Sequence, residues 1–383
     1  MTGRDKIKAA FSKDGTREIP VVIPYEGIFI RDHWEQLTDY PWWYRQEPNL
    51  EKQILWHRDA INKIGQDWLS LRDFYSTKDQ GNLNIQTTAN DDKVLLVDKS
   101  TVRQQKLSKP KVGGWSAGGH LESVKPEHIP KTTDEIDELI SDVSRFDKEK
   151  FLESGKCDLA SALLAEFGGQ LYPLCQISSP LWSCYGLWGF EGMMTMIASR
   201  ADLVKYACRR YLALGTNQVH KAAALGAQGI WIEECLTDMI SPDAFASLNV
   251  PFVRKLVEEI RTLGLESIYY YCGNPAGKWE HILSIGADAI SLEESKKGFE
   301  IDIEDVAAKV QGQCAVLGNL DAIGVLQDGS EEQLREEIAR QIAAGRRNSS
   351  RFIMSLGSPI TPETTVERVR LYCDMACQIA SAR

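Results

Sequence analysis

The chain has 383 residues, of which 43% are hydrophobic and 26% charged, values close to the globular average that exclude a disordered or fibrous chain. The net charge is −10 and the basic residues are scattered, which argues against a nucleic-acid partner, because phosphate backbones are bound by clustered Lys and Arg.

The sequence also argues against export and membrane insertion. No apolar run approaches the roughly 18–20 residues that a membrane helix needs, and the start, MTGRDKIKAAF, is charged where a signal peptide would be apolar. Nine cysteines in a long chain of this kind are typical of reduced thiols. We therefore expect a cytoplasmic protein with no membrane contact.

The N-terminal part contains two predicted strands, Ile19 to Ile23 and Trp68 to Leu71. The aromatic, helix-prone segment from Phe29 to Ile64 lies between them and is expected to form a helical cap. Residues 82–115 then alternate polar and apolar side chains around Asn90-Asp91-Asp92. This alternation predicts an antiparallel hairpin inserted in the fold, placed to shield one mouth of the site.

From about residue 158 onward, short apolar runs alternate with helical segments, which is the pattern of βαβ units. Strands are predicted at 171–177, 229–234, 267–272, 288–292, 314–319 and 352–356. The helices between them include 243–263, which Pro242 opens, and 330–345, which begins with a capping box of Ser330 and Gln333. No linker-like segment divides residues 1–383, so we expect one domain.

Eight predicted parallel strands with crossover helices fit either an open doubly wound sheet or a closed barrel, and both architectures place the active site at the carboxyl ends of the strands. The residues at those ends are Tyr25-Glu26, Arg72-Asp73, Ser178-Ser179, Glu233-Glu234-Cys235, Tyr270 to Asn274, Glu293-Glu294, Gly318 to Asp321 and Ser355 to Pro359.

The thiol at position 272 is a candidate ligand. Side chains two apart in a strand share a face, so Tyr270 and Cys272 point the same way. A carboxylate and a thiol from neighbouring strand ends can share a Zn²⁺ ion. The alternative is an inert buried cysteine.

Five segments carry a resemblance to a known family. They are GAQGIWIEECLTDMISPDAFASLNVPFVRKLVEEI (226–260), YYYCGN (269–274), GADAISLE (286–293), CAVLGNLDAIGVL (314–326) and RFIMSLGSPITPETTVERV (351–369). Together they resemble the uroporphyrinogen decarboxylase superfamily. This resemblance implies a (β/α)₈ TIM barrel, here with the inserted hairpin and the N-terminal helical cap.

That superfamily contains porphyrinogen decarboxylases and zinc-dependent methyltransferases that work with corrinoid proteins, including the first components of O-demethylases. The decarboxylases carry a signature similar to R-Q-A-G-R-Y, whose arginines grip the substrate carboxylates. Here the corresponding stretch reads IPYEGIFIRDHW (23–34). The missing clamp favours the methyltransferase branch.

Methyltransferases of this branch usually show H-x-C-G-N and a later G-C-G, whose His and two Cys hold zinc. This chain has Tyr270 at the histidine position, keeps Cys272, and has Ser358 at the second cysteine position. Glu234 resembles an acidic ligand of ether-cleaving relatives. The resemblance therefore implies zinc on Glu234 and Cys272, completed by Tyr270, Cys235, Glu293 or, less accessibly, Cys314. Without zinc, Tyr270 or Glu234 would act as a general acid.

The resemblance implies transfer of a methyl group from a small methylated donor, expected to be an aryl methyl ether, to the Co(I) of a separate corrinoid protein. Zinc would activate the leaving oxygen. Because no D-x-H-x-x-G motif occurs, cobalamin is expected to arrive on that partner. The expected substrate-binding residues are Tyr25, Trp182, Trp188, Glu293, Asn319 and Ser358.

Other readings stay open. A decarboxylase or related lyase would need a cation in the pocket, for which Arg72 is the candidate. A non-catalytic family member would also fit the altered ligand set. By analogy with relatives that are often dimers, a homodimer is expected. His57, His120, His220 and His281 are expected to be surface or packing residues rather than ligands.

Overall fold

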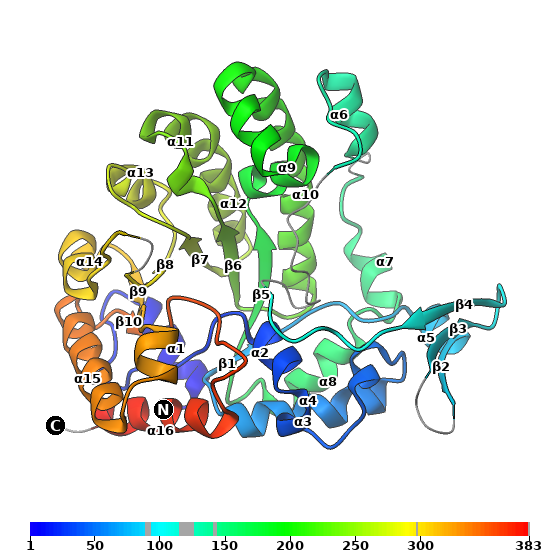
Figure 1. The fold of residues 1–383 in the computed structure, drawn as a ribbon, viewed down its shortest axis with the longest axis horizontal. Helices are drawn as coiled ribbons and strands as arrows, with labels where there is room; N and C mark the ends of the chain where they lie inside the picture. The colour runs from blue at the N-terminus through cyan, green and yellow to red at the C-terminus, as the bar shows by residue number, and fades with distance from the viewer. Residues whose placement is uncertain (89–92, 115–125, 141–143, 296–297, 382–383) are drawn as a thin grey trace.

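The computed structural model describes residues 1–88, 93–114, 126–140, 144–295 and 298–381. Its main sheet has seven strands, all parallel, in the order β1-β5-β6-β7-β8-β9-β10. They are β1 (Trp68–Ser70), β5 (Tyr172–Ser178), β6 (Gly229–Glu234), β7 (Glu266–Tyr271), β8 (Ala289–Leu292), β9 (Ala315–Leu317) and β10 (Phe352–Ile353). The sheet curls with helices around its outside (Figure 1), which confirms the predicted TIM-barrel fold.

The first predicted strand closes the barrel without forming a regular ladder. Val21 makes a single parallel bridge with Met354, next to β10. On the other side, the Asp67 amide donates to the Val21 carbonyl at 2.8 Å, and Asp67 Oδ2 accepts from the Val21 amide at 2.8 Å. Gln66 Oε1 accepts from the Ile23 amide at 2.9 Å. Side chains therefore replace part of the backbone pairing at this seam.

Helices surround this sheet and close one end of it. α1 (Gly3–Phe11) buries Ile7, Ala10 and Phe11 in the barrel interior, and the Phe11 ring lies 5.9 Å from that of Tyr172 at the start of β5. This helix therefore plugs the amino-terminal end of the barrel. The predicted N-terminal cap is formed by α2 (Glu26–Asp32), α3 (Trp34–Leu37), η1 (Trp42–Gln46) and α4 (Leu50–Ile64).

The remaining helices follow the strands in chain order. They are α5 (Thr77–Asn82), α6 (Thr133–Leu139), α7 (Lys148–Glu153), α8 (Asp158–Phe167), α9 (Pro180–Ser199), α10 (Ala201–Ala224), η2 (Thr237–Met239), α13 (Trp279–Ser284), α14 (Ile303–Val310), η3 (Ala322–Gln327), α15 (Glu331–Arg347) and α16 (Val366–Ser381). The predicted capping box of Ser330 and Gln333 at the start of α15 is confirmed. No helix within the described ranges is long and apolar enough to cross a membrane.

The single helix predicted over 243–263 is wrong, because the structure has two helices there. α11 (Pro242–Leu248) ends at Asn249, and α12 (Val250–Thr262) begins directly after it. Pro251 stands in the first turn of α12, where its missing amide costs least but where it prevents α11 from continuing. The break leaves the buried Asn249 side chain pointing at the end of β6.

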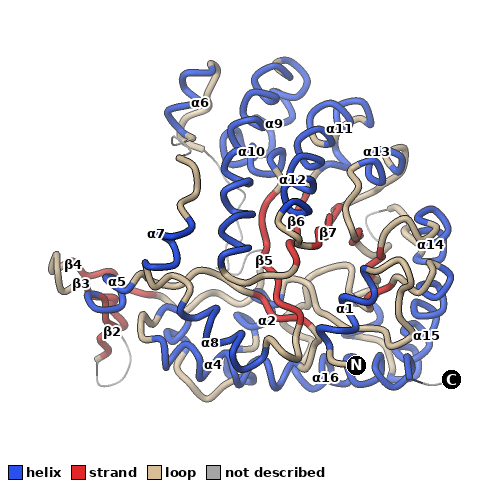
Figure 2. The backbone as a smooth tube through the Cα atoms, turned by 180° about the vertical axis from the view of Figure 1, so that it is seen from behind, coloured by secondary structure: helices blue, strands red, loops and turns tan. Residues whose placement is uncertain are grey.

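The predicted insertion is present, but it has three strands rather than two. β2 (Leu83–Thr87), β3 (Val94–Asp98) and β4 (Arg103–Leu107) form an antiparallel sheet. This small sheet projects from the barrel (Figures 1 and 2). The predicted turn Asn90-Asp91-Asp92 and the end of the insertion at Trp115 lie outside the described residues. The organisation as one domain stays a prediction.

Apolar side chains pack on both faces of the main sheet. One core fills the space between the sheet and the helices, with Ile230, Ile232, Tyr269 and Tyr271 among its members. The second core fills the inside of the barrel. It contains Trp68, Tyr172, Leu174, Trp231, Ile268, Tyr270, Ala289, Ala315, Leu317 and Ile353. The alternation along each strand therefore decides which side chains reach the barrel interior.

Candidate active site

Aromatic rings fill the middle of the barrel beneath its carboxyl end. Trp231 stacks on Tyr270 with ring centroids 5.2 Å apart, and Trp68 meets Trp231 edge-on at 6.0 Å. Tyr25 closes the group with edge contacts of 5.7 Å to Tyr270 and 6.1 Å to Trp231. This aromatic floor separates the barrel bottom from the open mouth.

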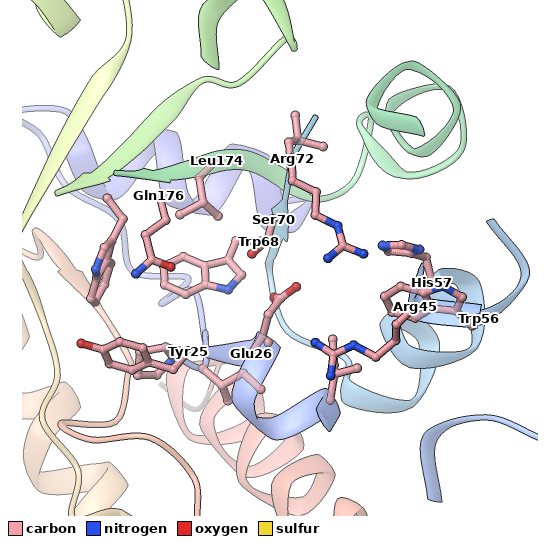
Figure 3. Close-up of a pocket in the computed structure, with 16 residues that line it drawn as sticks. Tyr25, Glu26, Arg45, Trp56, His57, Trp68, Ser70, Arg72, Leu174 and Gln176 are labelled. Carbon is pink, nitrogen blue, oxygen red and sulfur yellow. The ribbon is translucent and has the colours of Figure 1, made fainter. Parts of the chain in front are cut away.

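A cavity of about 270 Å³ opens above this floor, beside β1, β5 and β6. Its apolar wall includes Ile23, Tyr25, Trp56, Trp68, Leu174 and Trp231. Its polar wall consists of Glu26, Arg45, His57, Ser70, Arg72 and Gln176. The side chains of Glu26, Arg45 and Arg72 point toward the same space (Figure 3). A concave apolar pocket with a few converging polar groups is the usual form of a small-molecule site.

Glu26 is the acid of this cavity. It opens α2, directly after Tyr25, whose backbone has the left-handed angles φ 56° and ψ 35°. These angles are uncommon for a residue with a side chain, and they turn the chain from the barrel seam into the helix. Burial raises the pKa of Glu26 to about 7, against the hydrogen bond from Gln66 and the positive charge of Arg72. The carboxyl group is therefore partly protonated at neutral pH.

Two guanidinium groups share the cavity with this acid. Arg72 follows β1, and its carbon Cζ lies 5.7 Å from the centroid of the Trp56 ring. Arg45 comes from η1, and burial together with the charge of Arg72 lowers its pKa to about 10. His57 is stacked on Trp56 with centroids 3.5 Å apart, and burial followed by Arg72 holds its pKa well below the usual value. His57 is therefore a neutral wall of the cavity.

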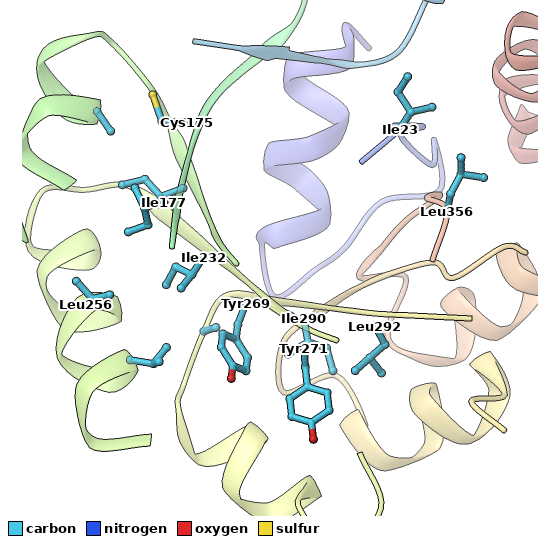
Figure 4. Packing of buried hydrophobic residues seen from close by; sticks show 14 of the residues in the cluster. Ile23, Cys175, Ile177, Ile232, Leu256, Tyr269, Tyr271, Ile290, Leu292 and Leu356 are labelled. Atoms are coloured by element: carbon cyan, nitrogen blue, oxygen red, sulfur yellow. The ribbon is translucent and has the colours of Figure 1, made fainter. Parts of the chain in front are cut away.

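Glu234 does not reach the cavity. It is fully buried, and its side chain accepts a hydrogen bond from Asn249 Nδ2 on the helix side of the sheet. The Tyr269 hydroxyl donates to Asn249 Oδ1 at 3.2 Å, and Tyr269 points to the same side of β7 as Tyr271 (Figure 4). Burial raises the pKa of Glu234 to about 8. The expectation that Glu234 and Cys272 face a common pocket is wrong.

Cys272 and Tyr270 lie inside the barrel, on one face of β7, as the alternation predicts. Their acidic neighbour is Glu233, which accepts a hydrogen bond from Gln176 Nε2 and contacts Cys235 Sγ at 3.8 Å. The hydrogen bond between the thiols of Cys235 and Cys272, and then burial, raise the pKa of Cys235. Burial also raises the pKa of Tyr270 far above its usual value.

The metal proposal can be tested on this donor set. Glu234 and Cys272 lie on opposite faces of the sheet, so one ion cannot bind both. Within the described part of the chain, no group of three or more His, Cys, Asp or Glu side chains is placed to hold a metal ion. Cys314 lies just before β9, at the amino-terminal end of its strand, where it was expected. The residues present do not fit a zinc centre.

Three predicted substrate-binding residues lie at the ends of β8, β9 and β10, away from the cavity beside β1, β5 and β6. The Asn319 side chain donates to the backbone carbonyls of Glu293 at 3.1 Å and Ile301 at 2.9 Å. Ser358 Oγ donates to Glu294 Oε2 at 2.7 Å. Glu293, Asn319 and Ser358 are all buried. The structure gives them the role of fixing the loops at these strand ends.

The two tryptophans expected after the third core strand differ from one another. Trp188 is 1% exposed, and its Nε1 donates to the Pro130 carbonyl at 2.9 Å, so it supports a loop rather than a ligand. Trp182 is half-buried in the first turn of α9, 5.2 Å from the ring of Tyr185. Neither lines the cavity, whereas Tyr25, also expected there, does.

Several cavity residues were not selected from the sequence. Glu26 and Arg72 were visible as strand-end residues, and Trp56 and Trp68 as part of the aromatic N-terminal segment. Arg45 and His57 had no such signal, because they come from the cap helices and reach the barrel mouth only through tertiary packing.

Comparisons with known proteins fit this architecture. The family model described as uroporphyrinogen decarboxylase (URO-D) matches residues 115–378. A uroporphyrinogen decarboxylase from Thermodesulfovibrio yellowstonii is 26% identical over 186 residues, which cover 49% of this chain and 47% of that protein. The methylcobamide:CoM methyltransferase MtbA from Methanosarcina mazei is 23% identical over 108 residues, or 28% of this chain and 30% of that protein.

Among solved structures, a methyltransferase from Methanosarcina mazei superimposes with a TM-score of 0.65 at 14% identity and covers 99% of both chains. At that identity the likeness shows the fold alone. The chain spans about half the length, or less, of these curated relatives. Since the family model covers most of the sequence, the chain belongs to the uroporphyrinogen decarboxylase family.

Proposed function

We propose that this protein moves a methyl group from a small methylated donor, an aryl methyl ether, to the reduced cobalt of a corrinoid carried by a separate protein. The family membership and the likeness to proteins named as methyltransferases support the proposal. The observation on which it mainly rests is Glu26, a carboxyl group with a pKa of about 7 that faces an aromatic cavity at the barrel mouth.

Breaking an aryl methyl ether leaves a phenolate, which is a poor leaving group at neutral pH. A proton delivered to the ether oxygen lowers this cost, and a general acid works best when its pKa lies near the operating pH. Glu26 meets this requirement. Trp56, Trp68 and Trp231 supply flat apolar surfaces against which an aromatic ring can pack.

The step balances with this one acid. The bond between the methyl carbon and the ether oxygen breaks, and its electron pair stays on the oxygen, which takes the proton from Glu26. The corrinoid supplies the electron pair for the new bond to the methyl carbon. Glu26 is left as a carboxylate and must regain a proton before the next turnover. No step is assigned to zinc, because the described donors do not converge on one ion.

Decarboxylation is the second candidate function, and Arg72 and Arg45 favour it. Cations in a pocket are what a substrate carboxylate needs, and both guanidinium groups face the cavity. The relatives named uroporphyrinogen decarboxylase are consistent with this reaction. In it, Glu26 would protonate the carbon that loses carbon dioxide.

One pair of assays separates these functions. The purified protein is incubated with guaiacol and free cob(I)alamin as the methyl acceptor, and catechol formation and loss of the cob(I)alamin absorbance are followed. The same protein is then incubated with 2-methoxybenzoate without cob(I)alamin, and carbon dioxide is measured. Demethylation that depends on cob(I)alamin supports the proposal. Carbon dioxide without demethylation supports a lyase, and neither product supports a non-catalytic member.

A further inference from the structure

We propose that Arg72 is an anion-binding residue of the barrel-mouth cavity and that the ligand it selects is a single-ring aromatic carboxylate. This proposal rests on the proposed function only in taking that cavity as the substrate site. It adds the chemical class of the substrate, which neither the family nor the general acid specifies. It follows from the charge balance and the shape of the cavity.

Arg72 is surrounded by protein, yet its side chain is accessible from the cavity that it lines. Among the described residues, its guanidinium group forms no hydrogen bond and no ion pair, and its contact is with the face of Trp56. An enclosed cation usually has an anionic or hydrogen-bonding partner, because it has lost part of its hydration. The donors of Arg72 therefore remain available to a ligand.

The nearby carboxylates are already engaged. Asp73, the next residue in the chain, pairs with Lys221 at 3.2 Å. Glu26 accepts the hydrogen bond of Gln66 and is partly neutral at pH 7 because of burial. Arg72 therefore keeps its full charge toward the cavity.

A second positive charge increases this imbalance. Arg45 lines the same cavity, and the acid nearest to it, Asp32, is held in a two-point contact by Arg31, with N–O distances of 2.7 and 2.9 Å. His57 adds no compensating charge, since it is neutral. Two guanidinium groups that face one space are stabilised when an anion binds between them, and a carboxylate matches their planar donor geometry.

The apolar part of the wall specifies the rest of the ligand. Trp68 and Trp231 meet at 90°, and Trp56 lies under Arg72, so a flat ring can contact aromatic faces while its charged group lies against Arg72. The cavity of about 270 Å³ lies at the lower end of the roughly 300–1,000 Å³ of small-molecule pockets. This size favours one ring over a macrocycle.

The test measures binding in the absence of corrinoid, so it does not depend on turnover. Benzoate, benzamide and inorganic phosphate are titrated into the wild-type protein by calorimetry. We expect benzoate to bind at least about tenfold more tightly than benzamide, because a charge-assisted contact is replaced by a neutral one. Phosphate is expected to bind more weakly than benzoate, because it lacks the ring.

A variant pair assigns the effect to the residue. Arg72→Gln should weaken benzoate binding by at least about tenfold and leave benzamide binding unchanged. Arg58→Gln is the matched control, because Arg58 is exposed on α4 and pairs with Glu166 outside the cavity. Equal affinity of the wild type for benzoate and benzamide, or phosphate binding as tight as benzoate, would overturn the proposal even if Arg72→Gln failed to fold.

The two failures are distinguishable. Benzoate binding without demethylation would leave the anion site standing and remove the methyl-transfer function. Demethylation of guaiacol without preference for benzoate would do the reverse.

Discussion

Glu234 is aligned with Tyr271 across β6 and β7, one residue out of step with the face that carries Tyr270 and Cys272. In a parallel ladder, residues in register point to the same side of the sheet. Glu234 therefore faces the helices together with Tyr269 and Tyr271, while Glu233 and Cys235 face the barrel interior with Cys272. Acid and thiol are near in sequence position along their strands but lie on opposite sides of a wall.

This separation predicts the outcome of metal analysis. Zinc content, measured by mass spectrometry, should be the same in the wild type, Cys272→Ala and Glu234→Ala, because no single ion can contact both side chains. Circular dichroism should accompany the measurement to show that each variant is folded. Loss of stoichiometric zinc in both variants would contradict the geometry.

The second prediction concerns the pH dependence of activity. Glu26 must be protonated to act as a general acid, and its pKa is about 7, so kcat/KM for methyl transfer should fall as the pH rises above 7. Glu26→Gln should lower the rate by about 10²–10⁴-fold and abolish this decline. Glu51→Gln, an exposed change on α4, is the control and should keep the wild-type profile. A decline that persists in Glu26→Gln would assign the proton to another group.

The third prediction concerns stability. The pKa of Glu234 is about 8 in the folded protein and 4.5 in its absence, so the folded state keeps a proton that the unfolded state releases between these values. The free energy of unfolding should therefore fall by about 1.4 kcal/mol per pH unit from this group as the pH rises from 4.5 to 8.

Glu234→Gln tests this contribution, because the amide oxygen can still accept from Asn249. The variant should match the wild type near pH 5 and be more stable near pH 8, as measured by urea unfolding. Glu300→Gln, on the surface, should be neutral at both values. A variant less stable than the wild type at pH 8 would mean that the buried group is ionised.

The fourth prediction concerns the joint between α11 and α12. Asn249 is fully buried and bonds both Glu234 and the Tyr269 hydroxyl. Asn249→Ala leaves both without this partner, so it should cost roughly 2–3 kcal/mol and lower Tm. Asn62→Ala on α4, where the side chain is exposed, should change Tm little. A loss below about 0.5 kcal/mol would show that the joint does not depend on this side chain.

The succession of strands and helices was readable from the sequence, since apolar runs of strand length recur between amphipathic segments. The break at Asn249 was not, because the apolar period continues through it, although Pro251 marked the place. The seam at Val21 was predicted as a strand, but only side chains of the following segment decide how it pairs.

For the site, strand alternation was applied to Tyr270 and Cys272 and was correct there. Extending it to the neighbouring strand requires the register, which no sequence pattern gives: Glu233 and Glu234 are equally good candidates until Glu233 is seen opposite Tyr270. The cavity itself depends on Arg45 and His57, which approach from cap helices that are distant from the barrel strands in sequence.

The irregular seam of the barrel has a dynamic consequence. Gln66 accepts from the Ile23 amide with one end and donates to Glu26 with the other, so a single side chain links wall closure to the acid. Local opening is easiest where ladder bonds are few. Deuterium uptake at the Ile23 amide should therefore change as Glu26 gains its proton, so that the breathing of the wall and the loading of the acid are one motion.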